Sequence, residues 1–390
     1  MVTCEVYVVS GPSTGRIGEQ QIPGGFDYLE RSLFLLSQSN PTCNFKVNVA
    51  HSVYHGPLLA LKDHKNLSVK IKQFNTADIP NFEALDPSRQ HGTLINHLLN
   101  SCPPESQYII LLDPDCFVLE TNLILKMINY MSNEEIGIVG VPYPAHYPKE
   151  YSWQTPQLYF SIFDTQRFNP LEIDFCAGGE ICSSLDNSRD PDITFRLLRR
   201  LKHFLVNVRA IKSRGGIDNF LSLKLSLLSE RFLINPRDTG WRIASVIKKD
   251  SIRIHICPFI IDSEVRIFGL NKSEFLQANP DLSHLKEHLG WYFFNHALIE
   301  GRAIGKQGLF PRFLKRLLAT AEDNREKWPS QSLMSSCALQ NPKTFMMIRE
   351  LLPMSDFYSF DSNFAIFHLG HKGKAGTKNT LQILDKIIGR

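Results

Sequence analysis

The sequence predicts an α/β fold in which a mostly parallel central sheet is covered by helices on both faces. The first observation is a series of short apolar runs, at Val2–Ser10, Tyr108–Leu112 and 136–141, with a further strand expected at 45–50. Continuous runs of this kind are typical of strands that are buried on both faces, as in a parallel sheet. The second observation is that segments with helical spacing lie between the runs, and this alternation is typical of βαβ units.

Three segments carry apolar residues at intervals of three or four, which predicts amphipathic helices. They are residues 28–37, 91–100 and 124–131. Later in the chain, residues 190–192 (Asp-Pro-Asp) form a strong helix start, and the apolar stripe that follows extends to Val208. The opposite face of this helix is rich in Arg and Lys. We interpret that face as solvent exposed, with docking to a membrane surface as the alternative.

The composition is that of a globular protein. Of 390 residues, 43% are hydrophobic and 21% are charged, which excludes a disordered chain, a collagen and a coiled coil. Lys and Arg number 43 against 39 Asp and Glu, and a surplus of +4 is too small for a nucleic-acid partner. Eight cysteines are scattered without a CxxC pair, which predicts reduced thiols and a cytoplasmic protein.

Membrane insertion is not expected. The longest apolar runs are far shorter than the roughly 18 to 20 residues that cross a bilayer, so we expect no transmembrane helix. The first residues lack a basic lead and a long apolar segment, which predicts that the mature protein starts at Met1. Membrane association is therefore limited to peripheral contact, at the inner face of the membrane.

The clearest chemical signal is the sequence Asp113-Pro114-Asp115, directly after the apolar run Tyr108–Leu112. Two carboxylates placed so close together need a cation. In a parallel sheet, ligands bind beyond the carboxyl ends of the strands, where Asp113 and Asp115 would hold Mg²⁺ or Mn²⁺ against a diphosphate. The alternative is a turn in which Asp113 only caps the chain that follows. The spacing alone does not decide between these two interpretations.

The chain around this motif resembles the GT-A glycosyltransferases, particularly the large inverting family that includes many bacterial polysaccharide enzymes. In that family a DxD motif binds the metal, which implies that Asp113 and Asp115 are metal ligands and that Asp113 also contacts the nucleotide-sugar donor. The resemblance includes the first strand, and it implies donor contacts from Ser10 and Gly11 at its end.

A second part of the resemblance is the helix of residues 28–37 and the segment 89–96, with the sequence Arg-Gln-His-Gly-Thr-Leu-Ile-Asn. In relatives this segment lies near the diphosphate of the donor. The resemblance therefore implies that Arg89 and His91 bind the nucleotide sugar.

Downstream, residues 237–242 (Arg-Asp-Thr-Gly-Trp-Arg) resemble the acidic element that opens a helix below the acceptor in this family. The first acidic position is Arg237, a departure from the family pattern, and Asp238 occupies the second. The resemblance implies that Asp238 is the general base that takes the proton of the acceptor hydroxyl. Asp238 also suits a helix N-cap, and both roles are compatible. Trp241 and Arg242 are expected to contact the acceptor, although Trp241 suits core packing equally well.

Near the C-terminus, His368 stands in the apolar run 364–369, and His371, Lys372 and Lys374 follow. Relatives often end their catalytic domain with a metal-binding histidine, so the resemblance implies that His368 is a third metal ligand. Imidazole is an ordinary ligand of Mn²⁺, and the lysines would suit a phosphate. A purely structural histidine at the end of a strand is the alternative.

The predicted domain organisation has three parts. We expect a GT-A domain over residues 1–268, a small helical module over 270–305 and a C-terminal region over 306–390. Within the last region, the segment 360–376 is expected to return to the active site. The module resembles, through its Asn-Pro-Asp and Gly-Arg elements, a short NPD…EGR-type unit that accompanies glycosyltransferase domains in bacterial surface-polysaccharide proteins.

The function implied by the resemblance is a metal-dependent, inverting transfer of a sugar from a nucleotide-diphosphate sugar to a hydroxyl of a carbohydrate or glycolipid acceptor. Two other classes remain. The pattern DxDxF after an apolar strand also resembles haloacid-dehalogenase-type phosphohydrolases, with Asp113 as nucleophile and Asp115 as acid/base. The third class is a non-catalytic sugar-binding protein of the same fold. The donor base and sugar are not specified, because residues 50–52 lack the aspartate that is usual after the second strand.

Overall fold

The computed structural model describes the chain in several stretches. These are residues 1–10, 14–17, 20–23, 25–52, 66–74, 87–142, 156–176, 178–179, 236–237, 240, 242–261, 277, 333–352, 355–369 and 378–389.

The main sheet has seven strands in the order β12-β8-β9-β6-β1-β4-β5. They are β1 (Val2–Ser10), β4 (Cys43–Ser52), β5 (Leu67–Phe74), β6 (Tyr108–Leu112), β8 (Ile138–Pro142), β9 (Pro156–Asp164) and β12 (Ile254–Ile256). Strand β9 is antiparallel to both of its neighbours, and the other pairs are parallel. The predicted α/β fold with a mostly parallel sheet is therefore confirmed.

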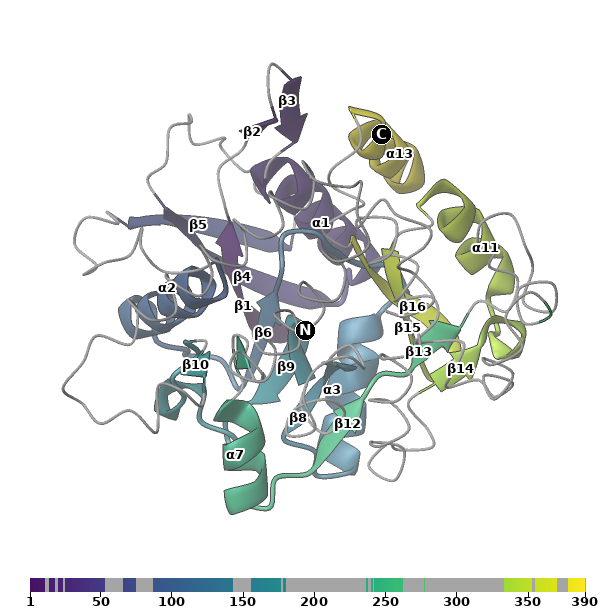
Figure 1. Ribbon diagram of the computed structural model, residues 1–390. Coiled ribbons are helices and arrows are strands. Elements are labelled where there is room, and N and C mark those ends of the chain that lie inside the picture. Colours follow the sequence, from purple (N-terminus) through teal and green to yellow (C-terminus); the bar gives the residue numbers. More distant parts are fainter. Residues whose placement is uncertain are drawn as a thin grey trace, which may run out of the picture.

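Helices cover both faces of this sheet (Figure 1). One face carries α1 (Gly25–Ser39) and α3 (Leu123–Asn133), and the other carries α2 (Pro87–Ser101) and α7 (Arg242–Lys249). Successive residues of a strand point to opposite faces. Val6 and Val8 of β1 accordingly pack in the core cluster with α1 and α3, while Tyr7 between them packs with α2 and α7.

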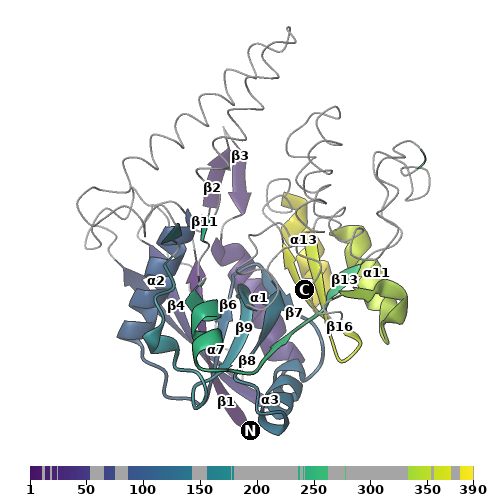
Figure 2. The same cartoon turned by 60° about the horizontal axis from the view of Figure 1, so that its bottom comes forward.

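A second sheet lies beside the first, with the strand order β14-β13-β15-β16-β7. Its strands are β7 (Cys116–Val118), β13 (Phe259–Ile261), β14 (Leu333–Ser335), β15 (Ser355–Phe360) and β16 (Asn363–Leu369). Two C-terminal helices, α11 (Pro342–Leu351) and α13 (Lys378–Ile388), complete this half, which confirms the expected helical additions. Figures 1 and 2 both show the C-terminal elements on the side of the main sheet that is remote from α2.

Short elements complete the described structure. The hairpin of β2 (Thr14–Ile17) and β3 (Gln20–Pro23) follows β1, and β10 (Gly178–Gly179) pairs with β11 (Pro236–Arg237). Two 3-10 turns lie at Pro170–Glu172 and Ser336–Ala338.

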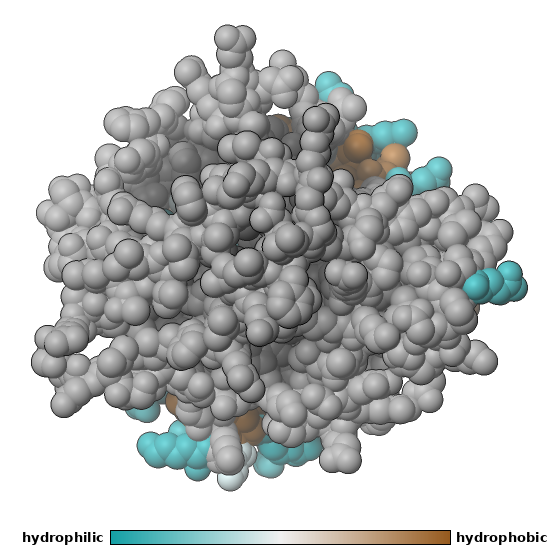
Figure 3. All heavy atoms as spheres, in the orientation of Figure 1, coloured by the Kyte–Doolittle hydropathy of each residue, from teal (hydrophilic) through white to brown (hydrophobic). Residues whose placement is uncertain are grey.

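The apolar residues of the described part are mainly inside the molecule. Large exposed hydrophobic side chains there are limited to Met1, Leu171 and Met347. Figure 3 shows brown areas beside teal ones at the edges of this face. In the described stretches, no helix combines the length and the apolar character needed to span a bilayer. The seven cysteines located there are all free.

Several predicted elements fall outside the described residues. They include the helix predicted from residue 190 to Val208 and nearly all of the helical module over 270–305, of which Gln277 alone is described and is helical. The proposed boundaries between the three domains are not tested. Strands β5, β7, β9 and β15 and the helices α11 and α13 were not predicted from the sequence.

Candidate active site

The Asp113-Pro114-Asp115 turn joins the two sheets. Strand β6 ends at Leu112 in the main sheet, and β7 begins at Cys116 in the second sheet. The backbone N–H of Asp113 donates to the carbonyl of Tyr159 in β9 (2.9 Å), and the carbonyl of Asp115 accepts from the N–H of Leu369 in β16 (3.0 Å). Backbone bonds to both sheets therefore fix the two aspartates.

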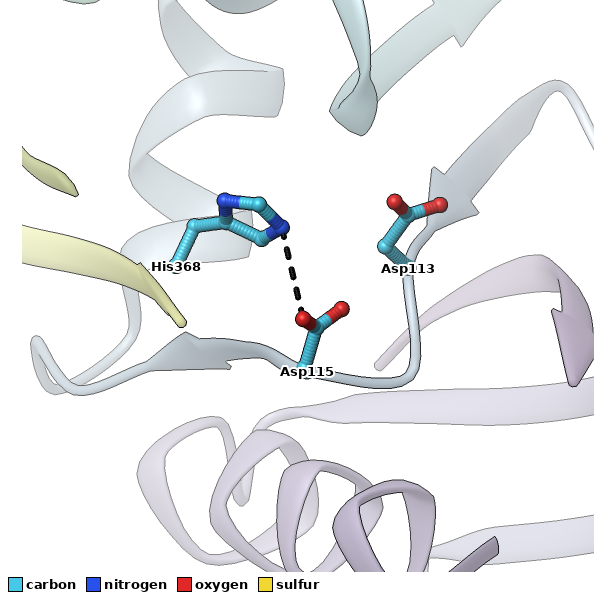
Figure 4. Close-up of side chains that lie close together, drawn as sticks. All are labelled: Asp113, Asp115 and His368. Atoms are coloured by element: carbon cyan, nitrogen blue, oxygen red, sulfur yellow. Dashed lines mark ion pairs between the residues drawn. The ribbon is translucent and has the colours of Figure 1, made fainter. Parts of the chain in front are cut away.

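Three side chains meet at this turn. One ligand atom from each of Asp113, Asp115 and His368 can be chosen so that all three lie within 4.8 Å of one another. Figure 4 shows the two carboxylates and the imidazole pointing toward a common space. The Nε2 of His368 lies 3.5 Å from Oδ2 of Asp115. Residues from distant parts of the sequence thus form one compact group of metal-binding type.

Strand register places His368 in this group. In the antiparallel pairing of β16 with β7, His368 stands opposite Cys116, the residue after Asp115. On the other side, β16 pairs with β15, where Asp356 stands opposite His368. The imidazole also stacks on the ring of Tyr159, with centroids 3.8 Å apart and planes inclined by 16°. Three strands therefore determine the position of one ring.

The electrostatics of the group fit a cation. Asp115 is 1% exposed and His368 is 5% exposed. Burial alone would lower the pKa of His368, but the Asp115 carboxylate and then the Asp356 carboxylate outweigh it and raise this pKa to about 9. A protonated imidazole thus offsets the buried charge of Asp115. A divalent ion could take over this role, because two carboxylates and an imidazole are a donor set that suits Mn²⁺ or Mg²⁺.

A second histidine borders the group from α2. The Nε2 of His91 lies 3.6 Å from Oδ1 of Asp113. His91 stands in the second turn of α2 (Pro87–Ser101), so this contact places the start of the helix at the Asp113 turn. His91 and Asp113, both predicted to bind the donor, are therefore neighbours.

The chain segment from Asp174 to Cys176 is fixed against α2. The amide of Asn96 donates to Oδ1 of Asp174 (2.8 Å) and accepts from the N–H of Phe175 (2.9 Å). The same Asp174 oxygen accepts from the N–H of Cys176 (3.0 Å). Burial would raise the pKa of Asp174, but these bonds and the nearby Arg242 lower it below its ordinary value. Asp174 is therefore an ionised anchor between α2 and α7.

Arg242 takes part in this anchor, because its guanidinium donates to Oδ2 of Asp174. The sequence predicted an acceptor contact for Arg242, which no observation tests. Strand β10 follows the anchored segment, and its Gly178 and Gly179 pair with Arg237 and Pro236 of β11. The two residues before Asp238 therefore pair with β10, which follows the segment from Asp174 to Cys176 in the chain.

The remaining predicted residues have different outcomes. Ser10 ends β1, and because Tyr7 pairs with Leu111 in β6, Ser10 lies at the same edge of the sheet as the Asp113 turn, fully buried. Gly11, Asp238 and Trp241 lie outside the described residues, and Arg89 is described only as part of the α2 backbone.

Three residues of this region were not predicted as functional from the sequence: Tyr159, Asp174 and Asp356. Tyr159 stands in an apolar run without a motif. Asp174 follows Glu172 by two residues, and Asp356 stands between Ser355 and Phe357. Neither aspartate belongs to a motif, so the sequence gives no local signal of its role.

Comparisons with known proteins give the following similarities. No family model and no curated protein matches the chain. Among solved structures, mouse xyloside xylosyltransferase 1 in its apo form is 10% identical, with a TM-score of 0.34 over 67% of this chain and 88% of that chain. TarS 1–349 of S. aureus is 13% identical, with a TM-score of 0.31 over 94% of this chain and 99% of that chain.

A further similar structure is a mannosyltransferase from Pyrobaculum calidifontis in complex with GDP-Man and Mn²⁺. It is 10% identical to this chain, with a TM-score of 0.29 over 83% of this chain and 87% of that chain. These TM-scores are low, so the fold is inferred from the strand order of this chain and the site from its own side chains.

Proposed function

We propose that the protein is a metal-dependent glycosyltransferase, which moves a sugar from a nucleotide-diphosphate sugar to a hydroxyl of a carbohydrate or glycolipid acceptor. The observation that carries this proposal is the convergence of Asp113, Asp115 and His368 within 4.8 Å at the carboxyl end of β6. A diphosphate and these two carboxylates carry like charge, so a cation between them is needed for binding. Bound Mn²⁺ or Mg²⁺ would offset the charge on the departing diphosphate.

The topology supports a ligand at this place. Strands β4 and β5 lie on one side of β1, while β6, which follows them in the chain, lies on the other side. The strand order therefore reverses between β1 and β6, and ligands of open α/β sheets bind in the crevice outside such a point. We assign the donor to this crevice and assign Ser10, Gly11, Arg89 and His91 as donor-binding residues.

The acceptor half of the proposal concerns the α2 side of the crevice. We assign Asp238 as the base that takes the proton of the acceptor hydroxyl, which makes the transfer inverting. This assignment is supported by the pairing of β11 with β10, since β11 ends one residue before Asp238. Trp241 and Arg242 are assigned to the acceptor, and Asp174 would hold the Arg242 guanidinium in place.

The phosphohydrolase alternative is less well supported. In that class Asp115 would have to exchange protons with the substrate. Its 1% exposure and its ion pair with His368 favour a role as a metal ligand instead. No described feature favours the non-catalytic alternative over an enzyme.

The proposal is tested by nucleotide release from UDP-, GDP-, dTDP- and CMP-sugars, each with Mn²⁺, with Mg²⁺ and with EDTA. We expect release from one donor class, abolished by EDTA and restored by either ion. Asp113→Asn and Asp115→Asn should stay folded and inactive, with Asp361→Asn, an exposed carboxylate in the turn after β15, as a matched control. Full turnover in chelated enzyme would contradict the proposal.

A further inference from the structure

The imidazole of His368 has two nitrogens, and each faces a different carboxylate. Nε2 lies 3.5 Å from Oδ2 of Asp115, and Nδ1 lies 3.7 Å from Oδ2 of Asp356. Asp356 is not a member of the three-residue group in which one ligand atom of each residue lies within 4.8 Å. Asp356 therefore contacts the edge of the imidazole that is opposite to Asp115.

We propose that Asp356 is a positioning residue of the metal site: its carboxylate accepts the Nδ1 proton of His368, so that Nε2 is the atom presented to the ion. This inference rests on the proposed function, because it assumes that Asp113, Asp115 and His368 hold a metal.

The backbone makes this arrangement specific. Asp356 and His368 are directly opposite each other in the β15–β16 ladder, and directly opposite side chains of an antiparallel pair lie on the same face of the sheet. The neighbouring pair, Phe357 and Phe367, consequently points to the other face, where both belong to the core cluster under α11 and α13. A shift of the register by one residue would move Asp356 away from the ring.

The contact between the two side chains is largely shielded from water. The side chain of His368 is 6% exposed and that of Asp356 is 14% exposed. Water therefore screens the pair little, and a hydrogen bond between ionised or polar groups is stronger in such surroundings than at the surface. A carboxylate in this position is costly unless it has a polar partner, and the His368 ring provides one.

Tyr159 provides the second constraint on the ring. Its side chain stacks on the imidazole at 3.8 Å, nearly parallel, so the ring plane is fixed from one side. Stacking does not distinguish the two edges of the imidazole, whereas the Asp356 carboxylate does. The plane is therefore set by Tyr159, and the identity of the nitrogen that faces Asp113 and Asp115 is set by Asp356.

The chemical consequence follows from how histidine binds metals. When a carboxylate accepts the proton of the nitrogen that is not bound, it fixes the tautomer and makes the metal-binding nitrogen more basic, and loss of such a partner typically weakens metal affinity about 10- to 100-fold. Both effects act on the nitrogen ligand alone. They do not act on the two carboxylate ligands.

The test is the affinity of the full-length protein for Mn²⁺ alone, measured by calorimetric titration without any donor. Asp356→Asn keeps the size of the side chain and removes its charge, and we expect its affinity to fall about 10- to 100-fold. The matched control is Asp361→Asn, in the exposed turn between β15 and β16, where φ is 47° and asparagine is tolerated as well as aspartate. This control should bind Mn²⁺ like the wild type.

Two further measurements separate positioning from general structural damage. Pulsed EPR of bound Mn²⁺ reports the coupling to the His368 nitrogen, which should be lost or altered in Asp356→Asn while the melting temperature stays near that of the wild type. Asp356→Glu keeps the charge on a longer side chain, so it should recover part of the affinity even if Asp356→Asn proves unstable.

The outcomes distinguish this inference from the function on which it rests. Wild-type Mn²⁺ binding together with unchanged affinity and unchanged nitrogen coupling in Asp356→Asn would overturn the role of Asp356 and leave the metal site standing. Absence of Mn²⁺ binding in the wild type would remove both. Weaker binding in Asp356→Asn, partial recovery in Asp356→Glu and an unaffected Asp361→Asn would support the inference.

Discussion

At the scale of single residues, the two compatible roles that we propose for Asp238, general base and helix N-cap, are separated by one substitution. Asp238→Asn keeps the shape and the capping ability of the side chain but removes the proton acceptor. Because general-base catalysis contributes about 10²- to 10⁴-fold, turnover should fall by roughly that factor, while donor affinity and melting temperature stay nearly unchanged. Steady-state kinetics, donor titration and thermal unfolding measure the three quantities.

The result also bears on the stereochemistry of the proposed reaction. NMR of the product should show inversion at the anomeric carbon, since a base on the acceptor implies direct displacement. A retained configuration would leave no need for a base at Asp238. Loss of stability with turnover preserved would instead assign the residue to capping alone.

At the scale of elements, the contact between α2 and the segment around Phe175 depends on a glycine. A Cβ added to Gly92 would lie 2.4 Å from the backbone carbonyl oxygen of Phe175, which a side-chain movement cannot relieve. A Gly→Ala change inside a helix is ordinarily stabilising by about 0.5–1 kcal/mol. Here we expect the opposite sign, with a loss of about 1–3 kcal/mol from overpacking.

Urea unfolding of Gly92→Ala measures this loss. Asn100→Ala, at an exposed position of the same helix, is the control and should change the free energy of unfolding little. If Gly92→Ala were as stable as the wild type, α2 and the anchored segment would not be packed as closely as described. Because β10 continues from that segment, the variant should also reduce turnover more than Mn²⁺ binding.

The elements also show what the sequence can and cannot predict. Tyr108–Leu112 was predicted as a strand because both faces are covered, which makes its sequence continuously apolar, whereas residues 45–50 alternate apolar and polar side chains. Strand β7 has three residues, too few for any period, and β15 reads SDFYSF, where polar and apolar residues mix. Asp356 of β15 faces His368 because of the register between β15 and β16. That register is a tertiary property, which the local sequence pattern does not reveal.

The candidate site, like the fold, was predicted from the sequence only in part. The paired aspartates were found because carboxylates after a buried strand are rare and need a cation. His368 was included through resemblance to a family, since nothing local distinguishes it from a structural histidine. Tyr159 was missed because a tyrosine in an apolar strand is ordinary core composition, and its stacking partner His368 comes from the distant strand β16.

At the scale of the whole molecule, His255 contributes a pH dependence to stability. Its ring lies edge-on between Tyr130 of α3 and Phe360 of β15, with centroids 4.9 and 5.7 Å away, so it touches both halves of the structure. Burial lowers the pKa of His255 from its ordinary value of 6.5. The folded protein therefore keeps this ring neutral at a pH where the unfolded chain binds a proton.

The sign of the effect follows from linkage. Above pH 6.5 both states leave His255 neutral, and as the pH falls below 6.5 the unfolded state gains a proton first, so stability decreases. His255→Phe should lack this component, and its free energy of unfolding should decrease less than that of the wild type between pH 7.5 and 5.5. Urea unfolding at the two pH values measures the difference. An equal decrease in both proteins would mean that His255 is protonated in the folded state.

The turn between β6 and β7 also has a consequence for the synthesis of the protein. The two aspartates precede His368 by more than 250 residues, so the ribosome releases the acidic half of the site long before the strand that brings the imidazole. An incomplete chain would hold a divalent ion weakly and with oxygen ligands alone. For the proposed transferase, we therefore expect that a chain that stops before β16 lacks the nitrogen ligand and binds the nucleotide sugar only weakly.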